Sequence, residues 1–257
     1  MYMTAKPMSE QAFLKTYRPD DFEHPSLAVD VVIVTVSGGR LGTVLVRRDE
    51  QPQLGRWALP GGFVGMNEGL DQAADRVLAT KAGLSGIYLE QLYTFGRTNR
   101  DPRTRVVSVT YMALVDAERL VAAVAGRGDG VTLSPLHIPW EGEVGGTVDV
   151  LQSSARPFRL AFDHGEILGV AVQRLRGKVG YAPVGYELLG DAFTLRDLQL
   201  VHEAILGHSL NKDSFRKTIL SRGQVESTGR REEGVAYRPA ELYRIAVRTP
   251  SSNQRSK

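Results

Sequence analysis

Hydrophobic residues follow two different periods along this chain of 257 residues. Two β-branched runs, joined by a Ser-Gly-Gly-Arg turn, fill residues 27–48 and predict a hairpin; further strands are predicted near 87–95 and 106–115. Residues 70–81 have helical spacing and end before Gly83. Residues 116–130 predict a short helix closed by a glycine-rich loop. Strands interleaved with helices indicate an α/β layered domain.

The secondary structure of two stretches after the helix predicted at residues 116–130 is not decided by their pattern. Residues 131–140 and 147–152 are compatible with edge strands or with a loop beside a pocket, and the pattern leaves both open. Helical spacing then returns after Phe162 and stops before Pro183, which predicts a connecting helix.

The last third of the chain predicts a different unit. Residues 193–207 form a helix capped by Thr194, and a second short helix follows the cap Asn211. Residues 224–247 alternate as a two-stranded ribbon, and its predicted tip carries Gly229, Arg230, Arg231 and Gly234. Helix, turn, helix and hairpin in this order describe a winged helix-turn-helix domain.

These patterns divide the chain into five parts. They are an N-terminal extension (1–25), an α/β domain (26–155), a connecting segment with its helix (156–184), a winged helix domain (185–248) and a disordered tail (249–257).

Composition narrows the class of protein. The absence of Cys excludes disulfides, thiolate catalysis and Cys-based zinc sites, and fits a reducing cytoplasm. No apolar run is long enough to span a membrane, and the polar start lacks a signal peptide, so we expect a cytoplasmic protein. The net charge of +3 is uneven: residues 190–257 carry 12 Lys/Arg against 8 Asp/Glu, or +4, which leaves −1 for the rest. This asymmetry suggests a polyanionic partner for the C-terminal part.

One motif lies where the first domain turns from a glycine loop into a helix. The segment "WALPGG" precedes five residues at fixed spacing, Gly62, Glu68, Arg76, Gly83 and Leu84. This span resembles the Nudix box, which cleaves pyrophosphates with a divalent metal. The resemblance implies an α/β Nudix-like sandwich, a mixed sheet with helices, followed here by a winged helix-turn-helix domain.

The metal ligands of that motif are missing. In the family, glutamates stand where this chain has Val77, Thr80 and Lys81, and helical geometry puts these three positions on one face. Asp71 and Asp75 project to the other side, and an ammonium at Lys81 repels a divalent ion. We therefore expect no metal site and no hydrolase activity, and interpret Glu68 and Arg76 as a scaffold ion pair rather than as catalytic residues.

A pocket that has lost its metal can still bind its ligand when other groups recognise that ligand. Backbone N–H groups of the glycine turn can donate hydrogen bonds to phosphate oxygens. Arginine side chains can bind phosphates through two parallel hydrogen bonds. Trp57 beside Leu59 is interpreted as a core residue rather than a base-stacking one. The arginines of residues 96–105 bind an anion or simply face water, and both readings stay open. The predicted effector-binding residues are Arg56, Gly61, Gly62, Glu68, Lys81, Arg100, Arg103 and Arg105.

The second domain has the sequence features of a DNA-binding domain. A short helix from Asn211 to Gly223, packed behind by Phe215 and Ile219 and polar in front, fits a major groove. Other groups would contact phosphates and set the register, with Arg238 reaching into a minor groove. The predicted DNA-binding residues are Thr194, Arg196, Lys212, Ser214, Arg216, Lys217, Arg230, Arg231 and Arg238.

Residues 185–247 resemble the C-terminal domain of the NrtR family of Nudix-related transcriptional regulators. The resemblance implies a homodimeric repressor of NAD biosynthesis or salvage genes that binds palindromic double-stranded operator DNA. It also implies ADP-ribose or a related nucleotide as effector, with no cofactor. Three alternatives remain: an active hydrolase that uses Glu68 with Glu141 or Glu143, a sibling regulator of sugar-utilisation genes, and a helical appendage for protein interaction without DNA.

Overall fold

The predicted hairpin forms the centre of the first domain in the structure, a computed structural model that describes residues 8–234, 236 and 238–246. Strand β1 (Ser26–Ser37) pairs with β2 (Arg40–Arg47), and Ser37 lies opposite Arg40. Gly38 and Gly39 have φ angles of 57° and 73°, and positive φ at both central residues suits the turn of a two-residue hairpin. The hairpin prediction is confirmed.

A mixed sheet grows outward from this hairpin. Its order is β5-β6-β1-β2-β7-β8; β1 and β6 run parallel, the other pairs along this path are antiparallel, β3 pairs with β2, and β4 pairs with β1. The two undecided stretches therefore supply an internal strand and an edge strand. The bounds are β3 (Trp57–Ala58), β4 (Gly61–Phe63), β5 (Leu89–Phe95), β6 (Val106–Leu114), β7 (Val131–His137) and β8 (Asp149–Val150).

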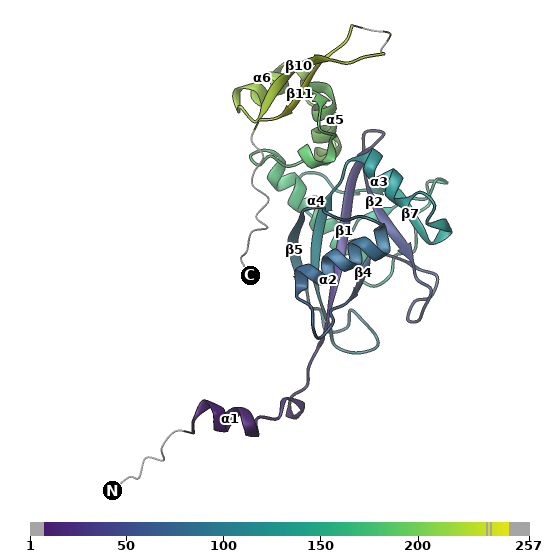
Figure 1. Ribbon diagram of the computed structural model, residues 1–257. Helices are drawn as coiled ribbons and strands as arrows, with labels where there is room; N and C mark the ends of the chain where they lie inside the picture. The colour runs from purple at the N-terminus through teal and green to yellow at the C-terminus, as the bar shows by residue number, and fades with distance from the viewer. Residues whose placement is uncertain (1–7, 235, 237, 247–257) are drawn as a thin grey trace.

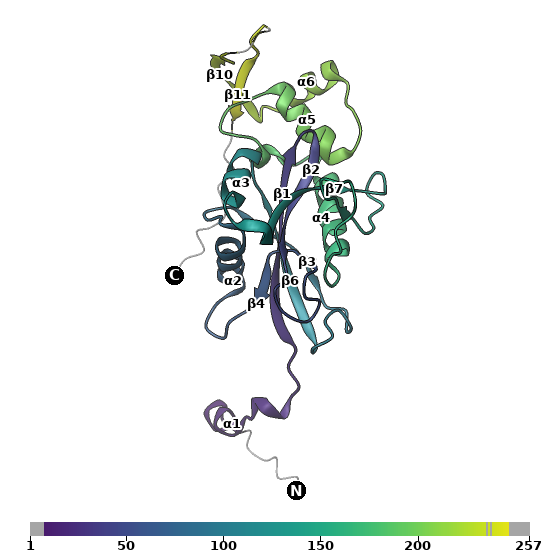
Figure 2. The ribbon, with the colours of Figure 1, turned by 90° about the vertical axis from the view of Figure 1, so that its right-hand side faces the viewer.

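Helices cover both faces of the sheet (Figures 1 and 2). On one face lie α2 (Leu70–Val77) and α3 (Ala117–Val124), both predicted, with a 3-10 turn at η3 (Gly128–Gly130) after α3. The last turn of the motif helix is a π-turn, η2 (Leu78–Ala82), and Gly83 ends it at φ 72°. Single π-turns are rare and often accompany functional sites.

The predicted connecting helix is a layer of the first domain. Helix α4 (His164–Val179) lies on the sheet face opposite α2, and Ile167, Leu168, Ala171 and Leu175 are buried in the core there. A sheet with two apolar faces needs a cover on each, which residues 26–155 alone do not supply. The division that set residues 156–184 apart is corrected in this respect.

The second domain has the predicted elements plus one short strand. Helices α5 (Leu195–Leu206) and α6 (Lys212–Ser221) pack on a sheet of order β10-β11-β9. A 3-10 turn, η4 (Tyr186–Leu188), precedes them. The predicted ribbon is β10 (Val225–Arg231) and β11 (Glu241–Ile245); the unpredicted strand is β9 (Phe193–Thr194).

The two domains share one apolar core. Val201 and Ile205 of α5 are buried in the same cluster as Val172 and Leu175 of α4. Arg176 adds a polar link: it donates to the carbonyl oxygens of Ile205 at 2.9 Å, Trp140 at 3.1 Å and Gly142 at 2.9 Å. Helices α4 and α5 are therefore in direct contact through apolar packing and through the hydrogen bond from Arg176.

The described part of the predicted N-terminal extension, residues 8–25, projects from the first domain (Figure 1). It contains α1 (Glu10–Thr16) and a 3-10 turn, η1 (Pro19–Asp21), neither with a buried residue. The predicted tail, 249–257, lies outside the described residues. Within the described part of the chain, no helix is long and apolar enough to cross a membrane.

Candidate functional site

The glycine turn between β4 and α2 is held by an ion pair, as interpreted from the sequence. Arg76 donates through Nε and Nη2 to the two carboxylate oxygens of Glu68, at 2.9 and 2.5 Å, and through Nη2 to the Phe63 carbonyl at 2.9 Å. The backbone N–H of Gly65 donates to the same carboxylate at 2.7 Å. The hydrogen bond from Arg76, followed by that from Gly65, lowers the pKa of Glu68 to about 2. Both oxygens of Glu68 are engaged in tying the turn to the helix.

Val77, Thr80 and Lys81, where the sequence analysis expects glutamates to be missing, differ in exposure. Val77 is 1% exposed and belongs to the core. Thr80 is exposed and its hydroxyl donates to the Arg76 carbonyl at 2.8 Å. Lys81 is exposed and lines the pocket described next. Among the residues the structure describes, no group of three or more His, Asp or Glu side chains is arranged to hold a metal ion.

A pocket of about 250 Å³ opens beside the glycine turn. Predicted effector residues Gly61, Gly62, Lys81, Arg100 and Arg103 line it. The structure adds residues that the sequence did not single out, and they come from β1, from the loop after β2, from the loop between β5 and β6, and from the segment that leads into the start of α4. These added lining residues include Asp30, Arg48, Asp49, Glu50, Asp101, Phe162 and His164.

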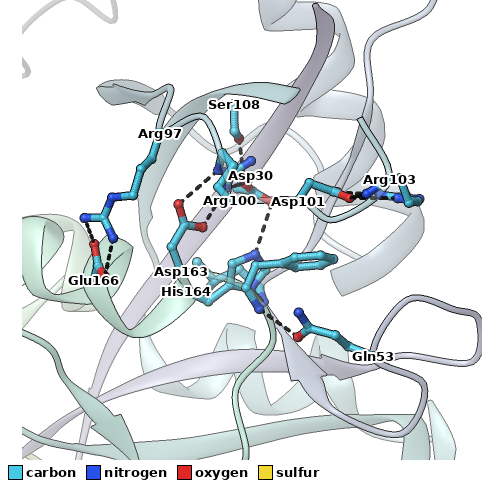
Figure 3. A network of polar contacts seen from close by, with 12 residues as sticks. Asp30, Gln53, Arg97, Arg100, Asp101, Arg103, Ser108, Asp163, His164 and Glu166 are labelled. Carbon is cyan, nitrogen blue, oxygen red and sulfur yellow. Dashed lines mark hydrogen bonds and ion pairs between the residues drawn. The ribbon is translucent and has the colours of Figure 1, made fainter. Parts of the chain in front are cut away.

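A buried polar network supports the pocket (Figure 3). Arg100 donates to both oxygens of Asp163, at 2.9 and 2.7 Å, and lies 3.5 Å from Asp30. Ser108 donates to Asp30 at 2.5 Å. The Arg100 side chain is only 6% exposed. Burial works against the charged form of Arg100, but the hydrogen bond and charges of Asp163 and Asp30 outweigh it, and its pKa is raised.

His164 completes this network from the first turn of α4. Its Nδ1 accepts the backbone N–H of Leu59 at 2.8 Å, so the ring proton sits on Nε2, which faces Asp30 at 3.8 Å. Burial lowers the pKa of His164 against the opposing charges of Asp30 and Asp163, and the ring is neutral at pH 7.

The glycine at position 61 is required by this network. A Cβ built there would lie 2.3 Å from the Asp30 carboxylate and 3.0 Å from the Val29 carbonyl. Only glycine lets the turn approach Asp30 this closely.

The predicted arginines differ in availability. Arg103 lines the pocket, pairs with Asp101 at 2.8 Å and has its guanidinium 5.1 Å from the centre of the Phe63 ring. The guanidinium of Arg100, predicted as a fork for phosphate, is already taken by two carboxylates. Arg105 donates to the Arg97 carbonyl at 3.1 Å.

Three predicted effector residues do not line the pocket. Arg56 is exposed outside it, Arg105 is bound to the adjacent loop, and Glu68 holds Arg76. Trp57 packs on the core and lies 4.9 Å from the Phe158 ring, as its core interpretation predicts. Which arginines reach a pocket depends on loop conformation, and no local sequence signal encodes that.

The DNA-binding prediction for Thr194 is contradicted by its surroundings. Thr194 is 5% exposed and caps α5: its hydroxyl accepts the N–H of Asp197 at 3.1 Å and donates to the Asp197 carboxylate at 2.9 Å. This reciprocal pair is a capping box. The capping role assigned to Thr194 from the sequence is confirmed, and it leaves no exposed hydroxyl for a phosphate.

Helix α6 presents the predicted polar face. Asn211 caps it by accepting the Ser214 N–H at 3.0 Å, and Phe215 and Ile219 are buried behind. Ser214 lines a cleft of about 610 Å³ toward α4, whereas Lys212 and Arg216 line a smaller groove toward the wing. The remaining predicted reader, Lys217, is exposed.

The wing carries its arginines on the strand rather than at the tip. Arg230 and Arg231 end β10, and β11 begins at Glu241. Arg231 donates to the Pro239 carbonyl at 3.0 Å, while Arg230 and Arg238 are exposed. Arg196, near the start of α5, is half exposed and lies 3.6 Å from Glu203.

Comparison with known proteins agrees with both domains. A NUDIX domain model matches residues 24–129, and a model of the NrtR DNA-binding winged helix domain matches residues 185–245. A protein of Acinetobacter baylyi named "ADPR responsive transcriptional repressor NtrR" is 36% identical over 241 residues, which is 93% of this chain and 89% of that protein. This chain belongs to the NrtR family.

Two further relatives match different parts of this NrtR chain. The crystal structure of Shewanella oneidensis NrtR complexed with a 27mer DNA is 33% identical, with a TM-score of 0.72 over 85% of this chain and 93% of that one. An ADP-ribose pyrophosphatase of Methanocaldococcus jannaschii is 32% identical over 108 residues, covering 42% of this chain and 60% of that protein. The NrtR resemblance thus spans both domains, and the hydrolase resemblance only the first.

Proposed function

We propose that this NrtR protein is a DNA-binding transcriptional repressor whose first domain senses ADP-ribose or a related nucleotide without cleaving it. The observation that carries the proposal is Lys81, a cation that lines the pocket at a position where a metal-dependent enzyme places a carboxylate. The second support is a winged helix domain packed against the same α4 that begins at the pocket. The name of the Acinetobacter relative agrees with such a role.

The pocket suits a diphosphate better than a metal. Lys81 and Arg103 bring positive charge to it, and Gly61 and Gly62 of strand β4 place no side chain between the backbone and a ligand. Its volume of about 250 Å³ falls below the range of about 300–1,000 Å³ typical of ligand pockets, so a dinucleotide-sized ligand is expected to extend beyond it. The effector residues proposed are therefore Gly61, Gly62, Lys81 and Arg103, with Arg100 acting through Asp30 and Asp163.

The winged helix suits double-stranded DNA. Lys212, Arg216 and Lys217 of α6 are exposed on a helix whose opposite face is buried, and this is the geometry of a major-groove reader. Arg196, Arg230, Arg231 and Arg238 are proposed to contact the sugar-phosphate backbone. By its family, the protein is proposed to bind palindromic operators of NAD biosynthesis or salvage genes as a homodimer in the cytoplasm.

The hydrolase alternative requires carboxylates that the structure keeps apart. Glu143 lines the cleft between α4 and α6, and Glu68 is bound to Arg76 at the glycine turn. Glu141 adjoins Gly142, whose carbonyl accepts Arg176 in the same region. Neither Glu141 nor Glu143 is among the residues that line the pocket beside the glycine turn, which speaks against this alternative. A sibling regulator that binds a sugar remains the second candidate and predicts a thermal shift with sugars instead of ADP-ribose.

Two assays on the full chain test the proposal. Genomic fragments selected by the purified protein are expected to share a palindrome, and ADP-ribose is expected to change their retention. In parallel, ADP-ribose incubated with protein and Mg²⁺ should stay intact, as followed by chromatography of AMP and ribose 5-phosphate. Enzyme-like turnover without selection of any DNA fragment would overturn it.

A further inference from the structure

Two residues beside the pocket hold backbone conformations that side chains rarely adopt. Phe162 has a φ of 51° and Gln53 a φ of 63°. The two are bound to each other, since the Gln53 amide oxygen accepts the backbone N–H of Phe162 at 2.9 Å (Figure 3). A left-handed conformation is unfavourable for a residue other than glycine, and such residues cluster at functional sites.

The turn itself does not require phenylalanine. Glycine or asparagine adopts the left-handed conformation at lower cost. This chain uses glycine for that purpose elsewhere: among the described residues, fifteen glycines and only three other residues have positive φ. The turn therefore gives no reason for a bulky aromatic side chain at position 162.

The ring does not serve the core. Among the described residues, Phe162 belongs to none of the three hydrophobic clusters, whereas Phe158, four positions earlier, packs against the largest of them. Phe162 is half-buried and lines the pocket instead. Its neighbours are the Arg48 guanidinium, 5.0 Å from the ring centre, and the His164 ring at 5.6 Å.

Arg48 is itself fixed beside this ring. Its Nε donates to the Pro52 carbonyl at 2.8 Å and its Nη2 to the Glu50 carbonyl at 3.4 Å. The loop after β2 thus holds both Arg48 and Gln53 against Phe162. A planar cation and an aromatic ring placed together form a surface on which a nucleobase stacks.

We propose that Phe162, with the Arg48 guanidinium packed over one face of its ring, is the platform that stacks the base of the nucleoside diphosphate ligand. This inference rests on the proposed function and deepens it, because it names the part of the site that distinguishes a nucleotide from a base-free sugar phosphate. Lys81, which lines the same pocket, is left for the diphosphate, and Arg103 lies beside it with its guanidinium paired to Asp101.

Phe63 is the competing aromatic residue. It also lines the pocket, is 45% exposed and carries Arg103 beside its ring. However, its place in β4 involves no positive φ, so a strand residue of any shape would adopt it. Phe63→Leu is therefore the matched control.

The test measures ADP-ribose affinity by calorimetry on the full chain for the wild type, Phe162→Gly, Phe162→Asn, Phe162→Tyr and Phe63→Leu. We expect the Gly and Asn variants to lose about tenfold or more in affinity, the scale of one stacked base, while the melting temperature is unchanged or raised. The Tyr variant should bind within about threefold of the wild type. Quenching of an etheno-adenine analogue of ADP-ribose should follow the same order.

Three results would overturn the stacking role. They are unchanged affinity in both Phe162→Gly and Phe162→Asn, equal losses in these variants and in Phe162→Tyr, or a loss in Phe63→Leu alone. If the wild type itself binds no ADP-ribose, the proposed effector fails and the platform fails with it. The wild-type titration thus separates failure of the function from failure of this inference.

Discussion

Arg100 shows how a single side chain decides what the pocket can bind. Its side chain is 6% exposed and pairs with both Asp30 and Asp163, which lie 133 residues apart in the sequence and adjoin the same pocket. Removing one partner of a buried ion pair leaves an unpaired charge in a poorly solvated site. Arg100 is thus a positioning residue that keeps two carboxylates from repelling an anionic ligand.

Arg100→Leu is expected to lower the free energy of unfolding by about 3–5 kcal/mol, because both carboxylates lose their buried partner. Chemical denaturation of the full chain measures this. Arg105→Leu removes an exposed guanidinium from the same loop and should change stability by no more than about 0.5 kcal/mol. Similar stability for both variants would show that the network contributes nothing.

Lys81 lines the pocket and is proposed to contact the diphosphate of the ligand. Lys81→Glu reverses the charge in the pocket and is expected to weaken ADP-ribose at least tenfold in calorimetry, since a carboxylate then faces the diphosphate. Arg40→Glu, at the exposed end of the hairpin, is the control for a change of net charge. Unchanged affinity in Lys81→Glu would rule out a phosphate contact at this position.

At the scale of elements, the sequence predicted what local patterns encode. The β1–β2 hairpin, α2 and the α5–α6 pair follow from turn residues, caps such as Asn211, and buried stripes. The features that the sequence did not predict depend on tertiary contacts. Strand β9 has only two residues, so it has no pattern of its own. Helix α4 is a layer of the first domain because it packs on a face of the sheet. The pocket's acids escaped prediction for the same reason, since Asp30 and Asp163 meet only in the folded chain.

Helix α5 carries a histidine that makes the second domain sensitive to pH. His202 is 6% exposed, lies edge-on to Phe215 at 5.1 Å, and its Nε2 has no hydrogen-bond partner in the structure. Burial, with a smaller contribution from the Arg222 charge, lowers the pKa of His202 from 6.5 to about 4. The unfolded chain therefore binds this proton more readily, and the stabilisation present above pH 6.5 is lost as the pH falls toward 4.

We expect the wild type to lose about 2 kcal/mol more stability than His202→Leu between pH 7.5 and pH 5, since one unit of pKa shift corresponds to about 1.4 kcal/mol. Urea denaturation followed by circular dichroism at both pH values measures the difference. His208→Leu, exposed after α5, should retain the wild-type dependence. Equal pH dependence in wild type and His202→Leu would contradict a neutral buried histidine.

At the scale of the whole molecule, α4 joins the pocket to the DNA-binding domain. Its 16 residues span about 24 Å, with His164 in the pocket and Arg176 bonded to the α5 carbonyl of Ile205. A ligand changes DNA binding only if it prefers one arrangement of the domains. Arg176, which bonds to carbonyls of both domains, is placed to carry that preference.

Arg176→Leu is expected to reduce the effect of ADP-ribose on DNA affinity at least threefold, because the polar link from α4 to α5 is lost, while each ligand alone still binds. Arg174→Leu is the matched control, since Arg174 lies on the same helix but contacts Glu90 and the Leu92 carbonyl of the first domain. Titrations of labelled duplex with and without ADP-ribose compare the two. Full coupling in Arg176→Leu would exclude this route.

The most direct test joins both halves of the molecule in one titration. Fluorescence anisotropy of a selected palindromic duplex would be measured against the full chain, with and without saturating ADP-ribose, in the presence of EDTA. We predict that ADP-ribose changes the Kd for the duplex at least tenfold although no divalent metal is available. An effect of ADP-ribose that appears only with Mg²⁺ and fades as the nucleotide is consumed, or no effect at all, would contradict a sensor that works by occupancy.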